Sequence, residues 1–440
     1  MNKSERMQLA QWSAGRARKA GAADAAITVA NQRDIDVEHR DGKLDKLQES
    51  TQNYLALKLY VNGRYSAHTT CDLRKETLGK FIEDAVTMTG HLTEDPFRAL
   101  PNPKYYAGRR EVDLQINDPF YADVTSERRV AIAREIDELT RSQSDKIVSA
   151  TSYYSDSHAE LAKVHTNGFE GETESTTFEA GVEVAASDGD KGRPQDYEWR
   201  SFRFFKDLAT SQVLARAAVD RVLGRLGQTK IATGVYDMVV ENRAVSKLLN
   251  ALTEPMGGYY LQQKSSFLDG KLGEKVASER LTLIDDPFIP AGLNSKTFDF
   301  EGMATRRRVM IDKGILKAFY IGDYYGKKLG MEPTTSSSTN TVFEYGARSP
   351  EEMLGDIKKG ILVTGFLGGN YNSTTGDFSF GVFGKLVEDG RIVKAINEMN
   401  VSGNLAELFN QLVEVGNDPY VYSALRRPSM RFEGISFSGI

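Results

Sequence analysis

The sequence predicts an α+β protein in two parts: an N-terminal mixed α/β platform with an antiparallel sheet, and a C-terminal, largely antiparallel β domain. Three observations predict this class. The first 90 residues have the order helix, a series of strands, helix, with short turns between the strands. Residues 147–205 are again rich in strand signals, and beyond residue 235 short strands separated by Asp-Gly and Lys-Gly turns dominate.

Composition describes an ordinary globular chain. It has 440 residues, 27% of them charged and 40% hydrophobic, and a formal net charge of −5 with both signs interspersed. This balance argues against direct nucleic-acid binding, which usually shows as a basic domain. The single cysteine, Cys71, excludes an intrachain disulfide framework and fits a reducing compartment. The sequence shows neither a signal peptide nor a membrane span, so we expect a cytoplasmic protein.

The N-terminal elements follow from periodicity and turn signals. A helix is expected over residues 4–20, with Ser4 as its N-cap and Gly21 as its stop. A second helix runs from Asp72, as its cap, to about Thr89. Between them we expect strands over 25–30, 33–39, 44–48 and 54–61, and a fifth run over 64–69 after the Asn62-Gly63 turn.

A proline-containing connector over residues 95–110 marks a possible sub-boundary within the N-terminal part. A helix follows over 126–141. Another spans 207–226, with Ala209, Val213, Ala217, Val222 and Leu226 near one stripe. Gly227 ends that helix, and we therefore predict an N-terminal domain of residues 1–227 and a C-terminal domain of residues 228–440.

The C-terminal part opens with a strand at 236–241 and a short helix at 243–252. One further helix is clear: Ser349 and Glu352 form a capping box with Pro350 at the first helical position, and Gly360 is the expected stop. The remaining signals are strands, at 281–284, 309–311, 315–320, 378–385 and 391–395.

From His165 to the C-terminus the chain has no histidine and no cysteine. A zinc site normally needs imidazole or thiolate ligands at about 2.0–2.3 Å. The C-terminal part therefore lacks the ligands of the usual zinc site, and it cannot activate a serine or cysteine nucleophile with histidine.

An ordered set of segments resembles the TldD/PmbA family, and most closely its PmbA (TldE) branch. Bacterial members of this family have been called modulators of DNA gyrase. The resemblance covers most of the chain. Its segments are NGFEGE at 167–172, VVENRAVSKLLNALTEP at 239–255, ERLTLIDDP at 279–287, KGILKAFYIGDYYGKKLGMEPTT at 313–335 and GNDP at 416–419.

The resemblance implies a zinc peptidase site in the catalytic branch, made by a His-Glu-x-x-x-His helix and a cysteine near the C-terminus. In this chain the two histidine positions are Asn250 and Pro255, the glutamate position is Ala251, and Tyr422 stands about where the cysteine is expected. Asn is a poor zinc ligand, and Ala and Pro offer none. The resemblance thus implies the fold without the chemistry: this chain has no catalytic residues and no metal or cofactor, and zinc belongs on a catalytic paralogue.

Other candidate ligands are weaker. Asp285, Asp286, Asp299 and Glu301 offer oxygen ligands, but without the loop spacing of a Ca²⁺ or Mg²⁺ site, so we expect a turn with solvated carboxylates. His158 and His165 are seven residues apart, which in a strand places them on opposite faces, so we interpret them as surface or structural histidines. The basic run Arg306-Arg307-Arg308 is interpreted as a solvated face.

The glycine-rich segment Gly368-Gly369-Asn370-Tyr371 has two interpretations. The favoured one is a β-turn or bulge that needs positive φ angles. The alternative is a contact for a peptide or partner, in which a peptide adds as a strand beside the glycines and Tyr371 supplies an aromatic surface.

Three functions remain open. The favoured one is a non-catalytic subunit of a TldD/PmbA-type metalloprotease assembly that processes or degrades peptides. It would pair with a TldD-like zinc-bearing paralogue, form a homodimer in isolation, and have a peptide as substrate. The second is a protein-binding regulator without proteolysis, as the name modulator of DNA gyrase suggests. The third, an independent peptidase, would need ligands that the sequence does not display.

Overall fold

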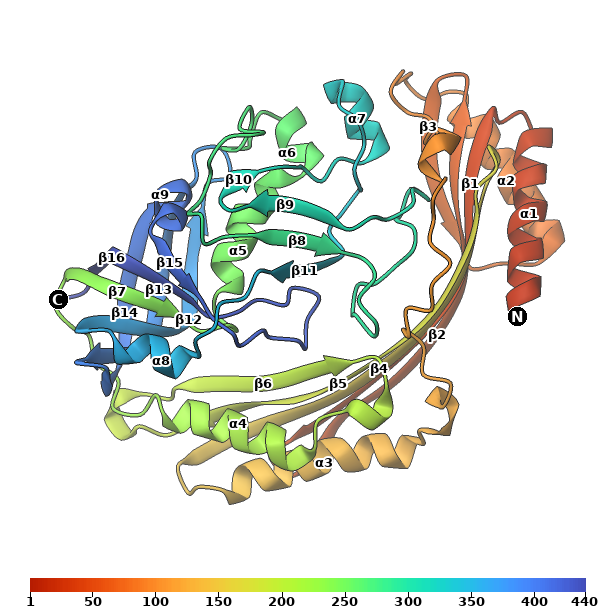
Figure 1. Ribbon diagram of the computed structural model, residues 1–440. Coiled ribbons are helices and arrows are strands. Elements are labelled where there is room, and N and C mark those ends of the chain that lie inside the picture. Colours follow the sequence, from red (N-terminus) through yellow and green to blue (C-terminus); the bar gives the residue numbers. More distant parts are fainter.

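The computed structural model describes residues 1–440, apart from the side chain of Lys191. A long six-stranded sheet curves around one side of a second β-rich body, with helices on its outer, convex face (Figure 1). The predicted α+β class, with antiparallel sheets and a C-terminal β domain, is confirmed. No helix among the described residues is both long enough and apolar enough to cross a membrane.

The N-terminal sheet is antiparallel throughout, in the order β3-β2-β1-β4-β5-β6. Its strands are β1 (Asp24–Arg40), β2 (Lys43–Val61), β3 (Arg64–Thr70), β4 (Ile147–His165), β5 (Glu170–Ala186) and β6 (Gln195–Phe202). The four strands predicted over 25–61 are in fact two. The polar residues that suggested breaks, around 31–32 and 49–53, remain paired across the β1–β2 ladder, because backbone hydrogen bonding does not require apolar side chains.

Two helix pairs cover one face of this sheet. Helices α1 (Lys3–Lys19) and α2 (Lys75–Thr89) pack over Ile27 and Val29, whereas α3 (Ser126–Ser142) and α4 (Ser211–Leu223) pack over Ile35 and Val37. These four strand residues share one parity along β1, so both pairs lie on the same face. The opposite, concave face carries no helix and turns toward the C-terminal body (Figure 1).

Three helix details differ from the sequence prediction. Asn2, not Ser4, caps α1, in a capping box with Glu5. Helix α2 begins at Lys75, because the Asp72 carboxylate accepts a hydrogen bond from the Arg74 N–H within a preceding turn. The buried stripe of α4 is one position out of register with the prediction: its members are Ser211, Leu214, Ala215, Ala218, Val219 and Val222, whereas Val213 is 43% exposed.

The main C-terminal sheet has the order β14-β13-β12-β7-β16-β15, and a further β14–β16 pairing closes five of these strands into a ring. The strands are β7 (Gly234–Val240), β12 (Lys359–Tyr371), β13 (Asp377–Glu388), β14 (Arg391–Asn404), β15 (Leu412–Val415) and β16 (Met430–Ser438). Only β7 and β12 pair in parallel within it.

A smaller sheet has the order β10-β9-β8-β11, formed by β8 (Leu283–Asp286), β9 (Arg308–Asp312), β10 (Ile315–Leu316) and β11 (Asn340–Phe343). Five short helices complete this body: α5 (Ser246–Thr253), α6 (Gly258–Gln262), α7 (Asp323–Leu329), α8 (Pro350–Gly355) and α9 (Leu405–Asn410). The capping box of α8 is confirmed, but the helix ends at Gly355 rather than Gly360, because Gly360 already pairs with Asp237 of β7.

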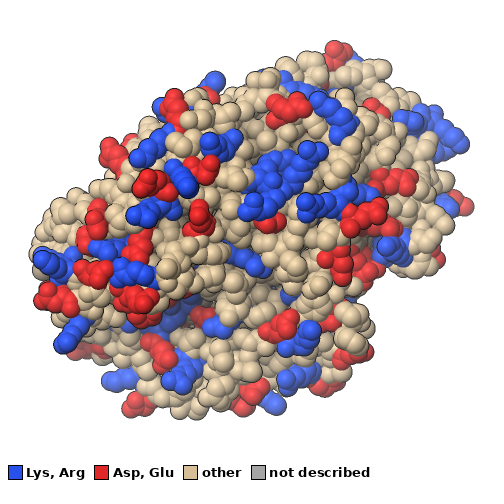
Figure 2. All heavy atoms as spheres, viewed as in Figure 1, with Lys and Arg blue, Asp and Glu red and all other residues tan. Residues whose placement is uncertain are grey.

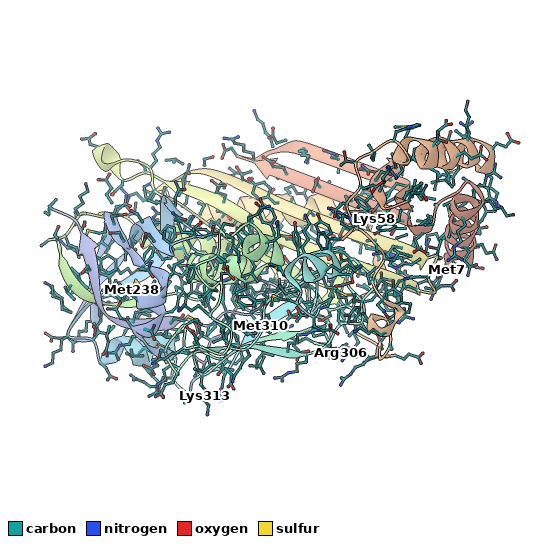
Figure 3. All side chains as sticks on the ribbon, turned by 90° about the horizontal axis from the view of Figure 1, so that it is seen from above. Met7, Lys58, Met238, Arg306, Met310 and Lys313 are labelled. Atoms are coloured by element: carbon teal, nitrogen blue, oxygen red, sulfur yellow. The ribbon has the colours of Figure 1, made fainter. Side chains whose placement is uncertain are left out.

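Charged contacts join the two bodies. Arg221 of α4 lies 2.6 Å from Glu241, which follows β7, and 3.0 Å from Asp196 of β6. Arg243, just before α5, lies 2.7 Å from Glu198 of β6. Seen from above, Met238, Met310 and Lys313 lie in the C-terminal body, and Met7 and Lys58 on the N-terminal one (Figure 3).

Candidate functional site

Helix α5 carries the positions that the family resemblance assigns to a zinc site. Ala251 is fully buried with Leu248, Leu249 and Leu252, so it packs in the core of the C-terminal body. Asn250 is exposed on the opposite side of the helix. Pro255 is buried in a 3-10 turn (Glu254–Met256) that ends the helix, as expected for a residue that cannot continue it. An amide, a methyl group and a pyrrolidine ring supply no strong ligand to zinc.

The fourth position, Tyr422, contacts the N-terminal sheet. Its ring lies 5.3 Å from that of Phe202 at the end of β6, and its hydroxyl accepts a hydrogen bond of 3.1 Å from Arg200. The Arg200 guanidinium also lies 4.5 Å from the centre of the Tyr422 ring. Tyr422 thus helps hold the segment before β16 against β6, and among the described residues no hydrogen bond or ring contact joins it to Asn250, Ala251 or Pro255.

The glycine segment forms the end of β12. Gly368 and Gly369 have φ angles of 53° and 76°, and the β12–β13 register shifts between Leu367 and Asn370. The favoured interpretation, a bulge with positive φ, is therefore correct. A Cβ on Gly369 would lie 2.1 Å from the carbonyl oxygen of Ser379 in β13, so the close approach of the two strands requires glycine there.

Beyond Val363, β12 loses its partner on one side. The parallel pairing with β7 covers only Gly360–Val363, whereas pairing with β13 continues to Tyr371. From Gly365 to Tyr371 the second edge of β12 has no ladder partner among the described residues. An unpaired edge of this kind can accept an extended peptide through main-chain hydrogen bonds.

Glu254 connects this edge to α5. Tyr371 and Tyr260 each donate a hydrogen bond to one oxygen of the Glu254 carboxylate. That hydrogen bond, with burial, raises the pKa of Tyr260 to about 12. Burial, followed by the bond to Glu254, raises the pKa of Tyr371 as well. Both phenols therefore stay protonated donors at neutral pH.

Glu254 escaped the sequence analysis because it occupies a variable position of the His-Glu-x-x-x-His pattern. Tyr260 and Tyr371 are 6 and 117 residues away from it along the chain. No spacing rule links such residues, so only the fold brings them together.

The histidines are not gathered at this site. His165 is buried against Tyr106, whose hydroxyl lies 3.0 Å from its Nδ1, and burial, with the charges of Lys163 and Lys58, lowers the pKa of His165 to about 3. His158 lies on the helix-covered face, across the sheet from Arg33, so the expectation of opposite faces agrees with the regular β1–β4 register.

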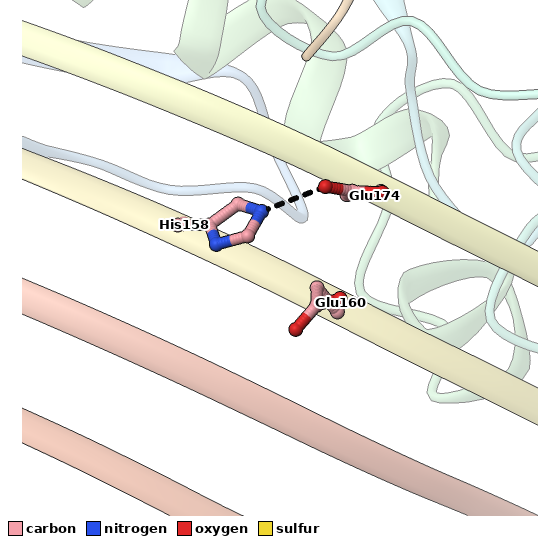
Figure 4. Close-up of side chains that lie close together, drawn as sticks. All are labelled: His158, Glu160 and Glu174. Carbon is pink, nitrogen blue, oxygen red and sulfur yellow. Dashed lines mark hydrogen bonds and ion pairs between the residues drawn. The ribbon is translucent and has the colours of Figure 1, made fainter. Parts of the chain in front are cut away.

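His158 nevertheless has acidic neighbours that the sequence did not reveal. The ligand atoms of His158, Glu160 and Glu174 lie within 4.8 Å of one another (Figure 4). Glu160 directly faces Glu174 across the β4–β5 ladder. These groups already have partners: Arg6, which is 3% exposed, pairs with Glu160, and Asn117 donates a 3.0 Å hydrogen bond to Glu174. The arrangement is that of a satisfied polar cluster.

The carboxylates expected to be solvated are largely buried. Asp285 is 0% exposed and accepts hydrogen bonds from the N–H and hydroxyl of Thr339, and burial raises its pKa. Asp299 is 3% exposed and accepts hydrogen bonds from the Glu301, Met303 and Ser336 N–H groups. These residues fix loop conformations in place of backbone partners.

Two arginines of the basic run, Arg306 and Arg307, are exposed as predicted, whereas Arg308 in β9 is partly buried. Figure 2 shows a group of basic side chains near the middle of the viewed face, among mixed charges elsewhere. Arg307 lies 3.3 Å from Asp286 and is about half exposed.

Comparison with known proteins identifies the class of this fold. Residues 233–439 match the PmbA/TldA metallopeptidase C-terminal domain, and residues 121–226 match the central domain of the same metallopeptidases. Together these ranges cover more than two thirds of the chain. The chain belongs to the PmbA/TldD family.

Individual relatives agree with this assignment. A crystal structure of a proposed modulator of DNA gyrase from Bacteroides thetaiotaomicron VPI-5482 is 39% identical, with a TM-score of 0.97 and full coverage of both chains. The structure of TldE from Thermococcus kodakarensis has a TM-score of 0.86 at 22% identity, covering 98% of this chain and 100% of that one, and so supports the fold alone. Metalloprotease PmbA of Escherichia coli O157:H7 is 26% identical over 94% of this chain and 92% of its own length.

Proposed function

We propose that this chain is a non-catalytic subunit of a TldD/PmbA-type metalloprotease assembly that processes or degrades peptides. One observation carries the proposal: in a chain of this family, the α5 positions expected to bind zinc and activate water are Asn250, Ala251 and Pro255. Ala251 is fully buried in an apolar core, and Pro255 ends the helix. These residues cannot replace two imidazoles and a general base.

The proposed partner is a zinc-bearing TldD-like paralogue, and the substrate is a peptide held partly by this chain. The unpaired edge of β12 and the contact residues Gly368, Gly369, Asn370 and Tyr371 supply a surface suited to an extended peptide. In isolation the chain would form a homodimer. An exposed free thiol, Cys71, favours a reducing compartment, so we assign the assembly to the cytoplasm.

We also propose a division of labour between residues 1–227 and 228–440. The first part would be the platform, and the second the peptidase-derived domain, with residues 95–110 as a connector within the platform. The Arg221 and Arg243 ion pairs would hold the two in one orientation.

A second candidate is a protein-binding regulator without proteolysis. The observation in its favour is the name of the 39% identical relative, a proposed modulator of DNA gyrase. The net charge of −5 favours a protein contact over a DNA contact for any such effect.

The test begins with the metal content per chain after purification and dialysis, measured by elemental mass spectrometry. We expect zinc well below one per chain, and no chelator-sensitive peptide hydrolysis by the isolated chain. The complex that co-purifies with a paralogue containing His-Glu-x-x-x-His should hydrolyse the peptide, and a chelator should abolish this activity. One firmly bound metal per chain would contradict the proposal and favour an independent peptidase. Lack of any such paralogue among the co-purified proteins would favour the regulator.

A further inference from the structure

The concave face of the N-terminal sheet contains a groove of about 580 Å³, within the usual size range of ligand sites. The side chains that point into it come from four adjacent strands on the face that no helix covers. They are Asp36 and Glu38 of β1, Tyr153 and Ser155 of β4, Glu179 and Glu183 of β5, and Tyr197 and Trp199 of β6, with Lys46 of β2 at the margin.

The groove has an excess of negative charge. Lys46 lies 3.3 Å from Asp36 and offsets that carboxylate. Among the described residues, no ion pair joins Glu38, Glu179 or Glu183 to a cation. The negative charges of Glu38 and Glu183, after burial, raise the pKa of Tyr153, which lies between them. A cation entering the groove would therefore meet carboxylates that have no cationic partner of their own.

Aromatic rings form the adjoining wall. Tyr197 and Trp199 are 44% and 50% exposed, unusually high for large rings, and their centres lie 5.2 Å apart. Gly181, opposite Trp199 in the neighbouring strand, leaves room for the Trp199 side chain, since a Cβ at position 181 would lie 2.3 Å from the Cβ of Trp199. One guanidinium of the chain already packs on these rings. That of Arg243 lies 4.5 Å from the centre of the Tyr197 ring and forms an ion pair with Glu198. Carboxylates beside exposed rings suit a guanidinium or ammonium group.

The groove continues toward the open edge of β12. A second hollow of about 380 Å³ shares Glu183 and Tyr197 with the first. It is also lined by residues 364–367 of β12 and by the basic side chains of Arg221, Arg225, Arg243 and Lys247, so the acidic character is confined to the first groove. A chain lying along that edge can therefore place a side chain in the acidic groove. This continuity favours an extended peptide over a small free cation.

We propose that this groove binds an extended peptide through an arginine or lysine side chain, set between Glu38 and Glu183 and against Trp199. The inference rests on the proposed function, and it specifies the substrate class: peptides with a basic residue. Recognition would come from charge and from the aromatic wall, while the edge of β12 would bind the main chain irrespective of sequence.

The test uses the full chain and the peptide acetyl-Gly-Arg-Arg-Gly-amide. The protein has two tryptophans, so a Trp12→Phe background leaves Trp199 as the reporter. We expect saturable quenching of Trp199 emission. Glu38→Gln combined with Glu183→Gln should weaken binding about tenfold or more, as loss of one charge-assisted contact does. The matched control, Glu111→Gln with Glu279→Gln, removes two exposed carboxylates outside the groove and should bind like the parent.

The same peptide with Glu in place of Arg should not quench. Equal affinity of the groove variant and its control would overturn the proposal, as would absence of quenching in the parent. A change of oligomeric state in the groove variant, without peptide binding in the parent, would assign the face to a subunit contact and also overturn it. Metal content and co-purification with the paralogue do not depend on these residues, so the proposed function can stand or fall separately.

Discussion

The Tyr371 hydroxyl donates a hydrogen bond to the Glu254 carboxylate, and so ties the bulged end of β12 to the turn that ends α5. The bond joins residues 117 positions apart. Tyr260 occupies the other oxygen of the same carboxylate. Helix α5, which carries the positions that the family resemblance assigns to zinc, and the glycine bulge are therefore one structural unit, although they are separate candidates in the sequence.

Removing one of the two hydrogen-bond donors to Glu254 should lower the stability of the protein only slightly. Tyr371→Phe keeps the ring and deletes the hydroxyl, while Glu254, which is exposed, can turn to water. We expect the free energy of unfolding to fall by about 0.5–1.5 kcal/mol, as for a typical hydrogen bond. Urea denaturation measures it, and Tyr260→Phe is the matched variant. A loss above about 3 kcal/mol would mean that Tyr371 has a packing role that the contacts do not reveal.

The bulge itself should be intolerant of a side chain. In Gly369→Val the new Cβ would clash with the Ser379 carbonyl at a φ of 76°, so β12 and β13 must separate locally. We expect about 1–3 kcal/mol of destabilisation, together with loss of peptide capture and of assembly with the paralogue. Gly368→Ala is the control, because its Cβ meets nothing within 4 Å and only the φ of 53° opposes it. Unchanged assembly and capture in Gly369→Val would remove the bulge from the proposed contact surface.

Local signals predicted the elements they govern. The capping box at Ser349, the Asn62-Gly63 turn and the helix starting near Ser126 are all present, since each depends on neighbouring residues alone. Elsewhere, strand pairing between distant parts of the chain determines the element in place of the local signal. The sequence predicts Gly360 as a helix stop because glycine often ends a helix, yet Gly360 belongs to β12, where its backbone pairs with Asp237. The short helices α6, α7 and α9 have too few turns to show a period.

The site was predictable only where the argument concerned residue types. Absence of histidine and cysteine ligands followed from the sequence, as did the glycine bulge. The pairing of Glu254 with Tyr371 joins residues 117 positions apart. The groove shared by β1, β4, β5 and β6 depends on the strand order of the whole N-terminal sheet. The sequence does not reveal that Asp285 is buried. A carboxylate can enter a core when it accepts hydrogen bonds, here from the N–H and hydroxyl of Thr339, and only the fold brings Thr339 to it.

The joint between the two bodies offers a test of the proposed domain boundary. Arg221 is bidentate to Glu241, at 2.6 and 3.0 Å, and also contacts Asp196. Arg221→Ala leaves the Glu241 carboxylate without its cation, while Asp196 keeps Arg225 at 3.9 Å. We therefore expect the free energy that holds the two parts together to fall by about 3 kcal/mol. Limited proteolysis should then cut faster near residues 227–233. Arg216→Ala, on the exposed side of α4, is the control. Equal cleavage rates would argue against a boundary at this point.

Stability should fall as the pH drops below about 6.5, because of His165. Its folded-state pKa of about 3 lies below the ordinary value of 6.5, so between these values the unfolded chain binds a proton that the folded chain does not. The stability associated with neutral His165 is therefore fully present above pH 6.5, and it is lost progressively as the pH falls toward the folded-state pKa. From pH 7.5 to pH 5 this amounts to about 2 kcal/mol, at 1.36 kcal/mol per pKa unit.

The measurement is urea denaturation at both pH values, and the informative quantity is the difference between wild type and His165→Gln. The glutamine amide can still form a hydrogen bond with the Tyr106 hydroxyl but does not titrate. The variant should lose about 2 kcal/mol less than wild type over this interval. His91→Gln, which removes an exposed imidazole, controls for loss of any histidine. An equal pH dependence in wild type and His165→Gln would show that His165 takes up a proton as readily in the folded chain as in the unfolded one, against the burial that the Tyr106 and Phe169 contacts impose.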